Sequence, residues 1–328
     1  MSFEIFSEYP CSTADDVRRI VGNHREPFRE LEDVYTRVQL LAPSLVEKSR
    51  EYARSGHYRY GGGYKSLVHS PGGESLYTEE VIKPALRYME ELGVYPPRVD
   101  VETMPSFSCF IQVHFALATP CLIRGEEAFY VHENPMLKEP VFKVPYFPGS
   151  SWKGNFRKAA LRLISQGVGS REVYERLFGP EIEQEEAFQG RLFFYPTFFD
   201  RLDLGVINPH SRRTKAGTNP ILEELAPVGS RGVISVLYLP YSIILRLDAE
   251  GLRREVPEDL KFLSEILTSV LHIWGFSARG SRGFGLAEEQ YLEGRVAVAG
   301  VGQKGFSSPQ QMLKRMEALC GIVERREL

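Results

Sequence analysis

The fold of this chain is decided by a turn and a helix start at residues 146–158, which read Tyr146-Phe147-Pro148-Gly149-Ser150-Ser151-Trp152-Lys153-Gly154-Asn155-Phe156-Arg157-Lys158. The Pro-Gly turn leads into a helix whose first turn holds two hydroxyls and whose body has only positive charges. Glycine lets a backbone approach a partner closely, and the free N–H groups of a helix start attract an anion. The stretch therefore predicts a basic helix over 151–165, with a phosphate backbone as its candidate ligand.

The spacing of the charges predicts two different sides for this helix. Lys153 and Arg157 are four residues apart, as are Lys158 and Arg162, so each pair lies along one side. Trp152, Phe156, Ala160 and Leu163 mark an apolar side. One side can pack while another meets a polyanion. The alternative is an ordinary solvated basic face, because most surface helices carry Lys and Arg.

Overall composition places the chain among soluble globular proteins. It has 328 residues, of which 43% are hydrophobic and 25% are charged. Its 40 Lys and Arg residues against 43 Asp and Glu residues give a net charge of −3, so the total charge does not indicate a nucleic-acid binder. Any basic surface must be local. An acidic run over 181–186 is expected to be a solvated loop.

The cysteines and the N-terminus indicate a reducing, cytoplasmic location. The four cysteines are scattered, without a paired C-x-x-C or a His-Cys cluster, which argues against a zinc site and a disulfide framework. The first residues lack the basic and apolar parts of a signal peptide. The longest apolar run, over 233–247, contains Pro240 and is too short to span a bilayer, so we expect no membrane association.

The first 98 residues are predicted to form a helical N-terminal extension. Helices are expected from Thr13 or Asp15 to residue 23, over 40–54 and over 77–92, and Pro96-Pro97 gives a plausible boundary. A loop over 54–65 mixes basic and aromatic residues, a mixture that can stack bases and neutralise phosphates. A plain flexible loop is the alternative for this segment. The remaining residues, 99–328, form the second predicted domain.

Beyond the boundary, the elements alternate in a recognisable order. Residues 107–117 alternate between apolar and polar, as in a half-buried strand. A helix over 151–165, strands over 191–199 and 233–247, a helix over 258–274 and a strand region over 284–298 follow. This order predicts an α+β fold with a ferredoxin-like (RRM-like, βαββαβ) core, in which two helices cover one face of an antiparallel sheet. The open face of such a sheet is a common platform for RNA.

A second glycine-rich element follows the helix over 258–274. Its loop can wrap close to a phosphate, with guanidinium groups aimed at the phosphate oxygens. The candidate binding residues in it are Arg279, Gly280, Ser281, Arg282 and Gly283. The loop follows a helix and lacks a Gly-Lys-Ser/Thr run, so it is neither a dinucleotide fingerprint nor a P-loop. It matches the opening of the RRM signature over 282–285 only, and a simple helix-to-strand connection is the alternative.

Four elements in this order resemble the RAMP superfamily of CRISPR-associated proteins, the RNA-binding subunits of type III effector complexes. They are the P-G-S-S-W-K-G turn with Arg157, the turn over 177–179, the strand opening at 190–192 and the loop over 279–285. The resemblance covers residues 107–298 and implies a ferredoxin-like core. It implies crRNA, target RNA and other CRISPR effector subunits as partners, in antiviral defence. The residues that it assigns to guide-RNA phosphates are Gly149, Ser150, Ser151, Lys153 and Arg157, together with the second-loop residues named above.

The same resemblance suggests a candidate catalytic segment at 131–135. Members of the family that cut target RNA use an acid before an Asn-Pro pair, acting with a divalent metal, and Glu133 takes that place here. An extra residue and a longer side chain depart from the family pattern, and in-line attack tolerates little displacement. His132 is a candidate general base, with an exposed loop histidine as the alternative. No cofactor is otherwise expected.

We therefore expect a guide-RNA-binding structural subunit of a type III ribonucleoprotein, and two alternatives stay open. The chain can be a guide-processing or target-RNA-cleaving endoribonuclease of the same superfamily, or an RRM-like binder of other cellular RNA. A further stretch over 207–215, with Arg212, Arg213 and Lys215, looks like a family insertion. Residues 1–98 are expected to serve as a subunit-docking extension.

Overall fold

The computed structural model describes residues 4–22, 31–46, 48–54, 63–70, 74–127, 130–180, 189–207, 221–241 and 249–325. The chain forms two compact units. The first combines Met1–Glu91, Leu122–Tyr146 and Phe199–Pro227, and the second combines Leu92–Cys121, Phe147–Phe198 and Val228–Leu328. The first segment of the helical unit ends seven residues before the predicted boundary at 98, and two later segments join it. A domain boundary at 98 stays a prediction.

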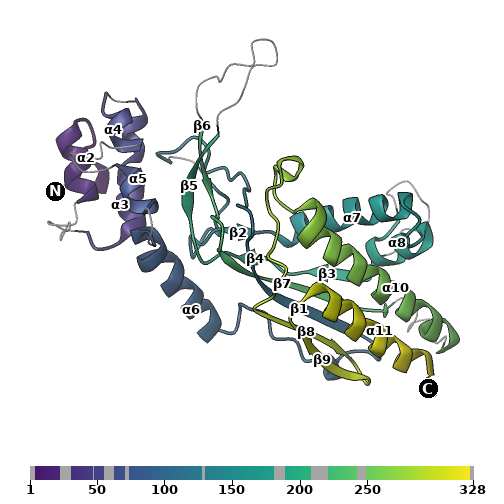
Figure 1. The fold of residues 1–328 in the computed structure, drawn as a ribbon. Helices are drawn as coiled ribbons and strands as arrows, with labels where there is room; N and C mark the ends of the chain where they lie inside the picture. The colour runs from purple at the N-terminus through teal and green to yellow at the C-terminus, as the bar shows by residue number, and fades with distance from the viewer. Residues whose placement is uncertain are drawn as a thin grey trace, which may run out of the picture. The chain divides into compact units, whose positions relative to one another are not determined.

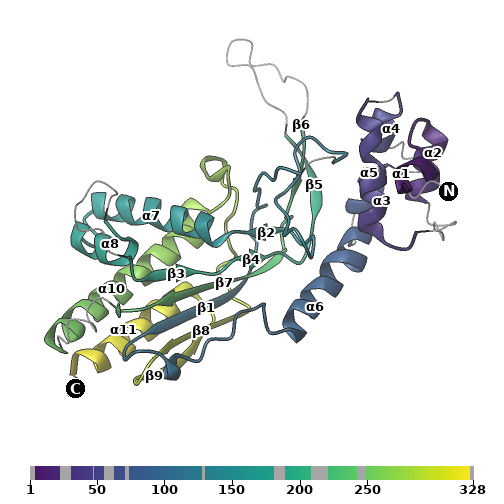
Figure 2. The ribbon, with the colours of Figure 1, turned by 180° about the vertical axis from the view of Figure 1, so that it is seen from behind.

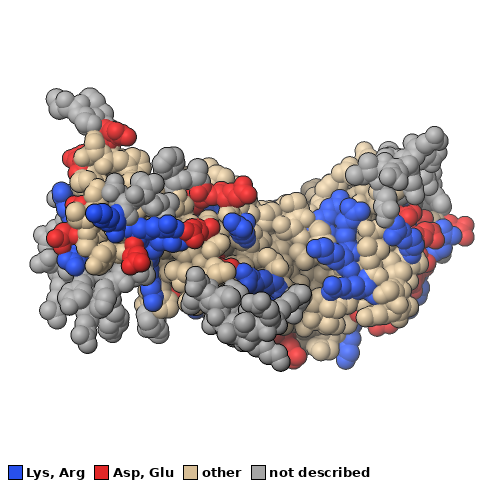
Figure 3. All heavy atoms as spheres, turned by 90° about the horizontal axis from the view of Figure 1, so that it is seen from above, with Lys and Arg blue, Asp and Glu red and all other residues tan. Residues whose placement is uncertain are grey.

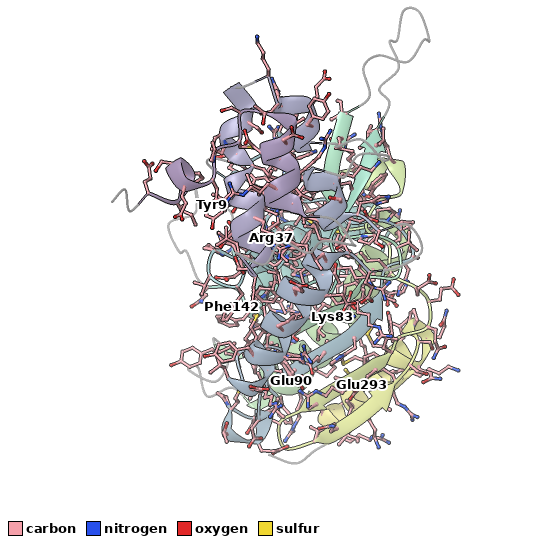
Figure 4. All side chains as sticks on the ribbon, turned by 90° about the vertical axis from the view of Figure 1, so that its left-hand side faces the viewer. Tyr9, Arg37, Lys83, Glu90, Phe142 and Glu293 are labelled. Carbon is pink, nitrogen blue, oxygen red and sulfur yellow. The ribbon has the colours of Figure 1, made fainter. Side chains whose placement is uncertain are left out.

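The first unit is mainly helical. It contains α1 (Ile5–Glu8), α2 (Ala14–Val21), α3 (Val34–Leu40), the 3₁₀ turn η1 (Ala42–Val46), α4 (Arg50–Arg54), α5 (Tyr64–Val68), the π-turn η2 (Thr78–Ile82), α6 (Lys83–Glu91) and a hairpin of β5 (Asp203–Ile207) and β6 (Ile221–Leu225). Thr13, one of the two predicted caps, is the N-cap of α2 and forms a capping box with Asp16. Figure 4 shows Arg37 among these helices, where its Nε donates to the Leu31 carbonyl at 2.7 Å.

The helix expected over 40–54 is wrong in extent. The structure has η1 and the short α4 in its place. Pro43 has no N–H to donate and its ring crowds the carbonyl four residues earlier, which disfavours a continuation of α3 through it. The prediction for 77–92 is closer, because η2 and α6 cover most of it and Gly93 adopts φ +71° just beyond.

The second unit is built on an antiparallel five-stranded sheet. Its strands are β1 (Cys109–Ala116), β3 (Leu192–Phe194), β7 (Arg231–Tyr238), β8 (Glu293–Val298) and β9 (Gly302–Phe306), in the order β3-β7-β1-β8-β9 (Figure 1). Every neighbouring pair is antiparallel, with Ile111 opposite Val236 on one side and Val296 on the other. The predicted mixture of helices and an antiparallel sheet is confirmed.

Helices cover one face of this sheet, as Figures 1 and 2 show for α10 and α11. They are α7 (Gly149–Ser165), α8 (Arg171–Phe178), α10 (Ala249–Ser269) with its π-turn η4 (Val270–Trp274), and α11 (Pro309–Arg325). Alternate β1 residues from Cys109 to Phe115 are fully buried, and Phe115 stacks edge-on against Phe276, 5.8 Å between ring centroids. No helix in the described part of the chain is long and apolar enough to cross a membrane.

The opposite face of the sheet is covered around β1 and β7, so it is only in part the open platform that we expected. Phe110 and Leu237 are buried there, with Val101 of the 3₁₀ turn η3 (Val101–Thr103) packed against them. The Gln112 side chain donates to the Pro97 carbonyl at 3.0 Å, which holds the covering segment in place. Apolar β1 side chains on both faces therefore explain why the strand is more buried than a half-buried pattern predicts.

Several predicted bounds also differ. The strand expected over 191–199 is split into β3 and β4 (Thr197–Phe198), and that over 233–247 ends at Tyr238, before Pro240. Helix α10 begins nine residues earlier than predicted and contains Pro257, because buried Leu252 and Val256 anchor the turns before the proline. The last strand of the predicted core is only β8, since residues before 293 form the glycine-rich loop and its return.

Candidate nucleic-acid interface

The basic helix predicted over 151–165 begins two residues earlier, at Gly149. Short β2 (Tyr146–Phe147) leads into the turn, and Pro148 at the N-cap position is extended, with φ −64° and ψ 150°. A Cβ on Gly149 would lie 2.3 Å from the Phe194 carbonyl oxygen, so this glycine is required by packing against β3. The first turn of α7, all of which is described, carries no acidic residue, which leaves the helix start attractive to an anion.

The apolar side of α7 is locked into the core. Trp152 is fully buried and its Nε1 donates to Thr197 Oγ1 at 3.0 Å. Its ring lies 4.6 Å from that of Phe276, at the base of the glycine-rich loop. Phe156 is also fully buried. The helix is therefore held rigidly, and its basic side is fixed in direction.

The basic side of α7 faces away from this core. Figure 3 shows Lys and Arg side chains gathered over α7, with few acidic side chains among them. Arg157 Nε donates to Tyr174 Oη at 3.0 Å, and the Arg162 guanidinium lies 5.4 Å from the centre of the Trp274 ring. Within the described part of the chain, neither Lys153, Arg157, Lys158 nor Arg162 forms an ion pair with a carboxylate. Their charge is thus available to an anion.

The glycine-rich loop is pinched at its base and open near its tip. Gly275 and Gly285 adopt φ +69° and +76°, and a Cβ on Gly275 would lie 2.4 Å from the Phe284 carbonyl oxygen. Phe276 N–H donates to the Gly285 carbonyl at 3.0 Å and closes the base. The tip is the 3₁₀ turn η5 (Gly280–Arg282), followed by Gly283 at φ +78°, whose Cβ position has no described atom within 4 Å.

The two predicted elements converge. Asn155 Nδ2 donates to the Ser151 carbonyl at 2.9 Å and lies 3.3 Å from the Phe276 carbonyl, so it joins α7 to the loop. Between them lies a groove of about 320 Å³. It is lined by Asn155, Lys158, Ala159, Arg162, Val270, Ile273, Trp274, Gly275, Ser277, Ala278 and Gly280. One groove therefore combines cationic, amide and aromatic groups from both elements.

Sequence reasoning named the two elements that border this groove but chose largely different side chains. Of the ten RNA-binding residues predicted, only Gly280 lines this groove. Asn155, Lys158 and Arg162 were absent from that set, although their spacing of three and four residues puts them on one face of α7. Trp274 carried no signal in the sequence, because it looked like the last apolar residue of an amphipathic helix. The RNA-binding roles of all these residues stay predictions.

Two of the family motifs have a structural task. A Cβ on Gly190 would lie 2.4 Å from the Phe178 carbonyl carbon, so the segment that leads into β3 needs glycine there to pass the end of α8. Arg191 Nη1 contacts Asp259 Oδ2 at 2.6 Å, and Arg176 Nε contacts its Oδ1 at 2.9 Å. Asp259 is fully buried and also accepts from Tyr238 Oη at 2.9 Å. This cluster ties α8, β3, β7 and α10 together.

The candidate acid, Glu133, lies in the first unit, and both of its carboxylate oxygens face arginine side chains. Glu133 pairs with Arg50 through one oxygen, and its other oxygen lies 3.1 Å from Arg54 Nη2. Hydrogen bonding to Arg54 lowers the pKa of the Glu133 carboxyl. Within the described ranges, no three His, Cys, Asp or Glu side chains gather to hold a metal ion. Glu133, with both carboxylate oxygens facing arginines, does not fit a divalent metal ion.

His132 is buried, so the alternative of an exposed loop histidine was wrong. His132 is 3% exposed, and its Nδ1 accepts a hydrogen bond from the Asn134 N–H at 3.1 Å. Burial, together with the nearby Arg54, lowers the pKa of His132 to about 4. A buried imidazole with that pKa is neutral at pH 7 and is a weak general base. The loop over 54–65 and the insertion over 207–215 lie largely outside the described residues.

Comparisons with known proteins agree with the motifs. A sequence model of the RAMP superfamily matches residues 61–288. The CRISPR system Cms endoribonuclease Csm3 of Streptococcus thermophilus is 28% identical over 182 residues, which span 52% of this chain and 81% of that protein. Among solved structures, a chain of the Type III-B Cmr-beta bound to cognate target RNA aligns with a TM-score of 0.47 at 14% identity, covering 90% of this chain and 99% of that one. Methanopyrus kandleri Csm3 aligns with a TM-score of 0.40 at 17% identity, covering 67% of this chain and 99% of that one.

Proposed function

The chain belongs to the RAMP superfamily, and from this premise we propose that it is a guide-RNA-binding structural subunit of a type III CRISPR ribonucleoprotein effector complex in antiviral defence. Its partners are crRNA, target RNA and other effector subunits, in the cytoplasm. We further propose that β1, α7, β3, β7, α10 and β8 form a ferredoxin-like core, since the spatial order β3-β7-β1-β8 is that of a split βαβ arrangement.

The convergence of α7 and the glycine-rich loop on one groove carries this proposal. Lys158 and Arg162 enter the groove from α7, and the loop contributes its backbone at Gly275 and Gly280. Cations that lack acidic partners attract a polyanion, and backbone N–H groups can then approach phosphate oxygens. The net charge of −3 is compatible with this role because only one surface has to face RNA.

Salt-dependent RNA binding tests the proposal. The full chain is titrated against a labelled single-stranded RNA that contains a CRISPR repeat, and anisotropy is followed at several salt concentrations. For single strands, log K falls with a slope of about −0.7 for each phosphate neutralised. Lys158→Ala with Arg162→Ala should therefore reduce the slope by about 1.4.

A matched control comes from α11. Lys314 and Arg315 are exposed neighbours on that helix, and replacing both with Ala removes the same charge from another surface. We expect the slope of log K against log salt concentration for this double variant to match that of the unaltered chain. Absence of RNA affinity, or equal slopes for both double variants, would reject the assignment of the groove. RNA that co-purifies from the host should contain repeat sequence, whereas other cellular RNA would favour the RRM-like alternative.

The second candidate function is cleavage of guide or target RNA, which is favoured by similarity to the Streptococcus thermophilus relative, an endoribonuclease by name. Against it, both oxygens of Glu133 face arginines and His132 is buried. Incubating the chain with repeat RNA and with guide-complementary RNA, with and without Mg²⁺, distinguishes the two functions. Site-specific cutting that is lost in Glu133→Gln or His132→Ala would favour the nuclease, and intact RNA at saturating protein favours the structural subunit.

A further inference from the structure

One wall of the groove is apolar, which phosphate binding alone does not require. Val270, Ile273 and Trp274 of η4 line it opposite the cations of α7. Ile273 is 63% exposed, and Trp274 is partly exposed, whereas Trp152, the second tryptophan of the chain, is fully buried. Large apolar side chains at a polar groove usually mark a ligand with an apolar face.

The backbone of Trp274 is held firmly. It ends η4, and the next residue, Gly275, turns the chain with φ +69°. A Cβ on Gly280 would lie 2.9 Å from the Trp274 carbonyl oxygen, so the tip of the loop packs against this residue. The indole is therefore presented to the groove from a rigid support, which reduces the entropic cost of stacking a ligand on it.

Arg162 completes an arrangement suited to a flat, electron-rich ring. Its guanidinium lies 5.4 Å from the centre of the Trp274 ring, within the range of a cation–π contact. A planar guanidinium stacks on aromatic faces and also attracts phosphate. With Lys158 on the same groove, one phosphate and the base attached to it could both be held.

We propose that Trp274 is a stacking platform for one unpaired base of single-stranded RNA, with Arg162 and Lys158 holding the adjoining phosphate. The inference rests on the proposed RNA-binding function and adds the base as a recognised group. The groove of about 320 Å³ is at the small end of ligand sites, so it takes a single nucleotide rather than a stacked run. Every base has a flat face, so the platform is tolerant of sequence.

The test compares two probes on the full chain. One is a single-stranded RNA of mixed sequence, and the other is an abasic ribose-phosphate strand of the same length and charge. The unaltered chain should bind the RNA about tenfold more tightly, and RNA should quench the fluorescence of Trp274. Trp274→Ala should lose most of this preference while keeping salt-dependent binding, and Trp274→Phe should keep part of it.

Leu161→Ala serves as the control, since this α7 residue is 41% exposed and is not among the groove-lining residues. It should behave as the unaltered chain does. Equal affinity of the unaltered chain for both probes, or an unchanged preference in Trp274→Ala, overturns the base platform while the proposed function survives. Failure of both probes to bind overturns the two together. The comparison of probes on the unaltered chain stands even if Trp274→Ala fails to fold.

Discussion

Replacing Gly154 by alanine should change the stability of helix α7 and the affinity for RNA in opposite directions. It lies inside α7, where glycine lowers helix stability by about 0.5–1 kcal/mol relative to alanine. A Cβ at this position has no described atom within 4 Å, so packing within the chain gives no reason for glycine. Gly154→Ala should therefore raise the free energy of unfolding by about 0.5–1 kcal/mol, or raise the midpoint temperature by about 2 °C for a unit of this size.

The same substitution should weaken RNA binding. Gly154 lies one turn before Lys158 on the same side of α7, and Lys158 lines the groove. A methyl group that moves a phosphate from about 4 to about 5 Å from the ammonium reduces their attraction by roughly 0.8 kcal/mol at an effective dielectric constant of about 20. The expected loss of affinity is therefore about fourfold.

Gly321 supplies the matched control. It lies inside α11, and its Cβ would meet only the Arg325 guanidinium at 3.5 Å, an ordinary contact. Gly321→Ala should stabilise the chain by a similar amount and leave RNA affinity unchanged. Thermal unfolding by circular dichroism and fluorescence anisotropy measure the two effects. If the Gly154→Ala variant is more stable and still binds RNA as tightly as the Gly321→Ala variant, then glycine is not needed at position 154 to let RNA come close to α7.

Three further predictions concern polar residues whose contacts lie within one of the two units. Asp259→Asn should lower the free energy of unfolding by about 2–3 kcal/mol in urea titrations, because it removes the one fully buried carboxylate that Arg176 and Arg191 share, while both arginines still face Glu255; a loss below about 1 kcal/mol would contradict this. Since His132 has a folded pKa of about 4, the unfolded chain takes up its proton first as pH falls below about 6.5. Stability should therefore fall by up to roughly 3 kcal/mol by pH 4, and His132→Gln should flatten that dependence relative to the unaltered chain. Glu133→Gln should cost less than about 1 kcal/mol at pH 7, because its ion pairs are solvent-exposed, and should leave RNA affinity unchanged in anisotropy titrations.

Local patterns in the sequence were sufficient for much of the second unit. The strand at β1, the apolar side of α7 and the helix before the glycine-rich loop depend on neighbours within a turn or a strand, and the structure has all three. Helix α10 begins nine residues before its predicted start and runs through Pro257, because buried contacts of the preceding turns outweigh the lost hydrogen bond. The RAMP motifs likewise identified the family, since they mark close backbone approaches that only glycine permits.

Only the tertiary structure decided which side chains share a site. Trp274 and Arg162 are more than a hundred residues apart, yet they meet at one groove. Glu133 meets Arg50 and Arg54 across about eighty residues, and His132 becomes buried within the same unit. Helical and strand periods report which face of an element is apolar, but they carry no information on which distant element covers that face. The charges, pKa values and partners of these groups depend on that covering, and so they follow from the packed fold alone.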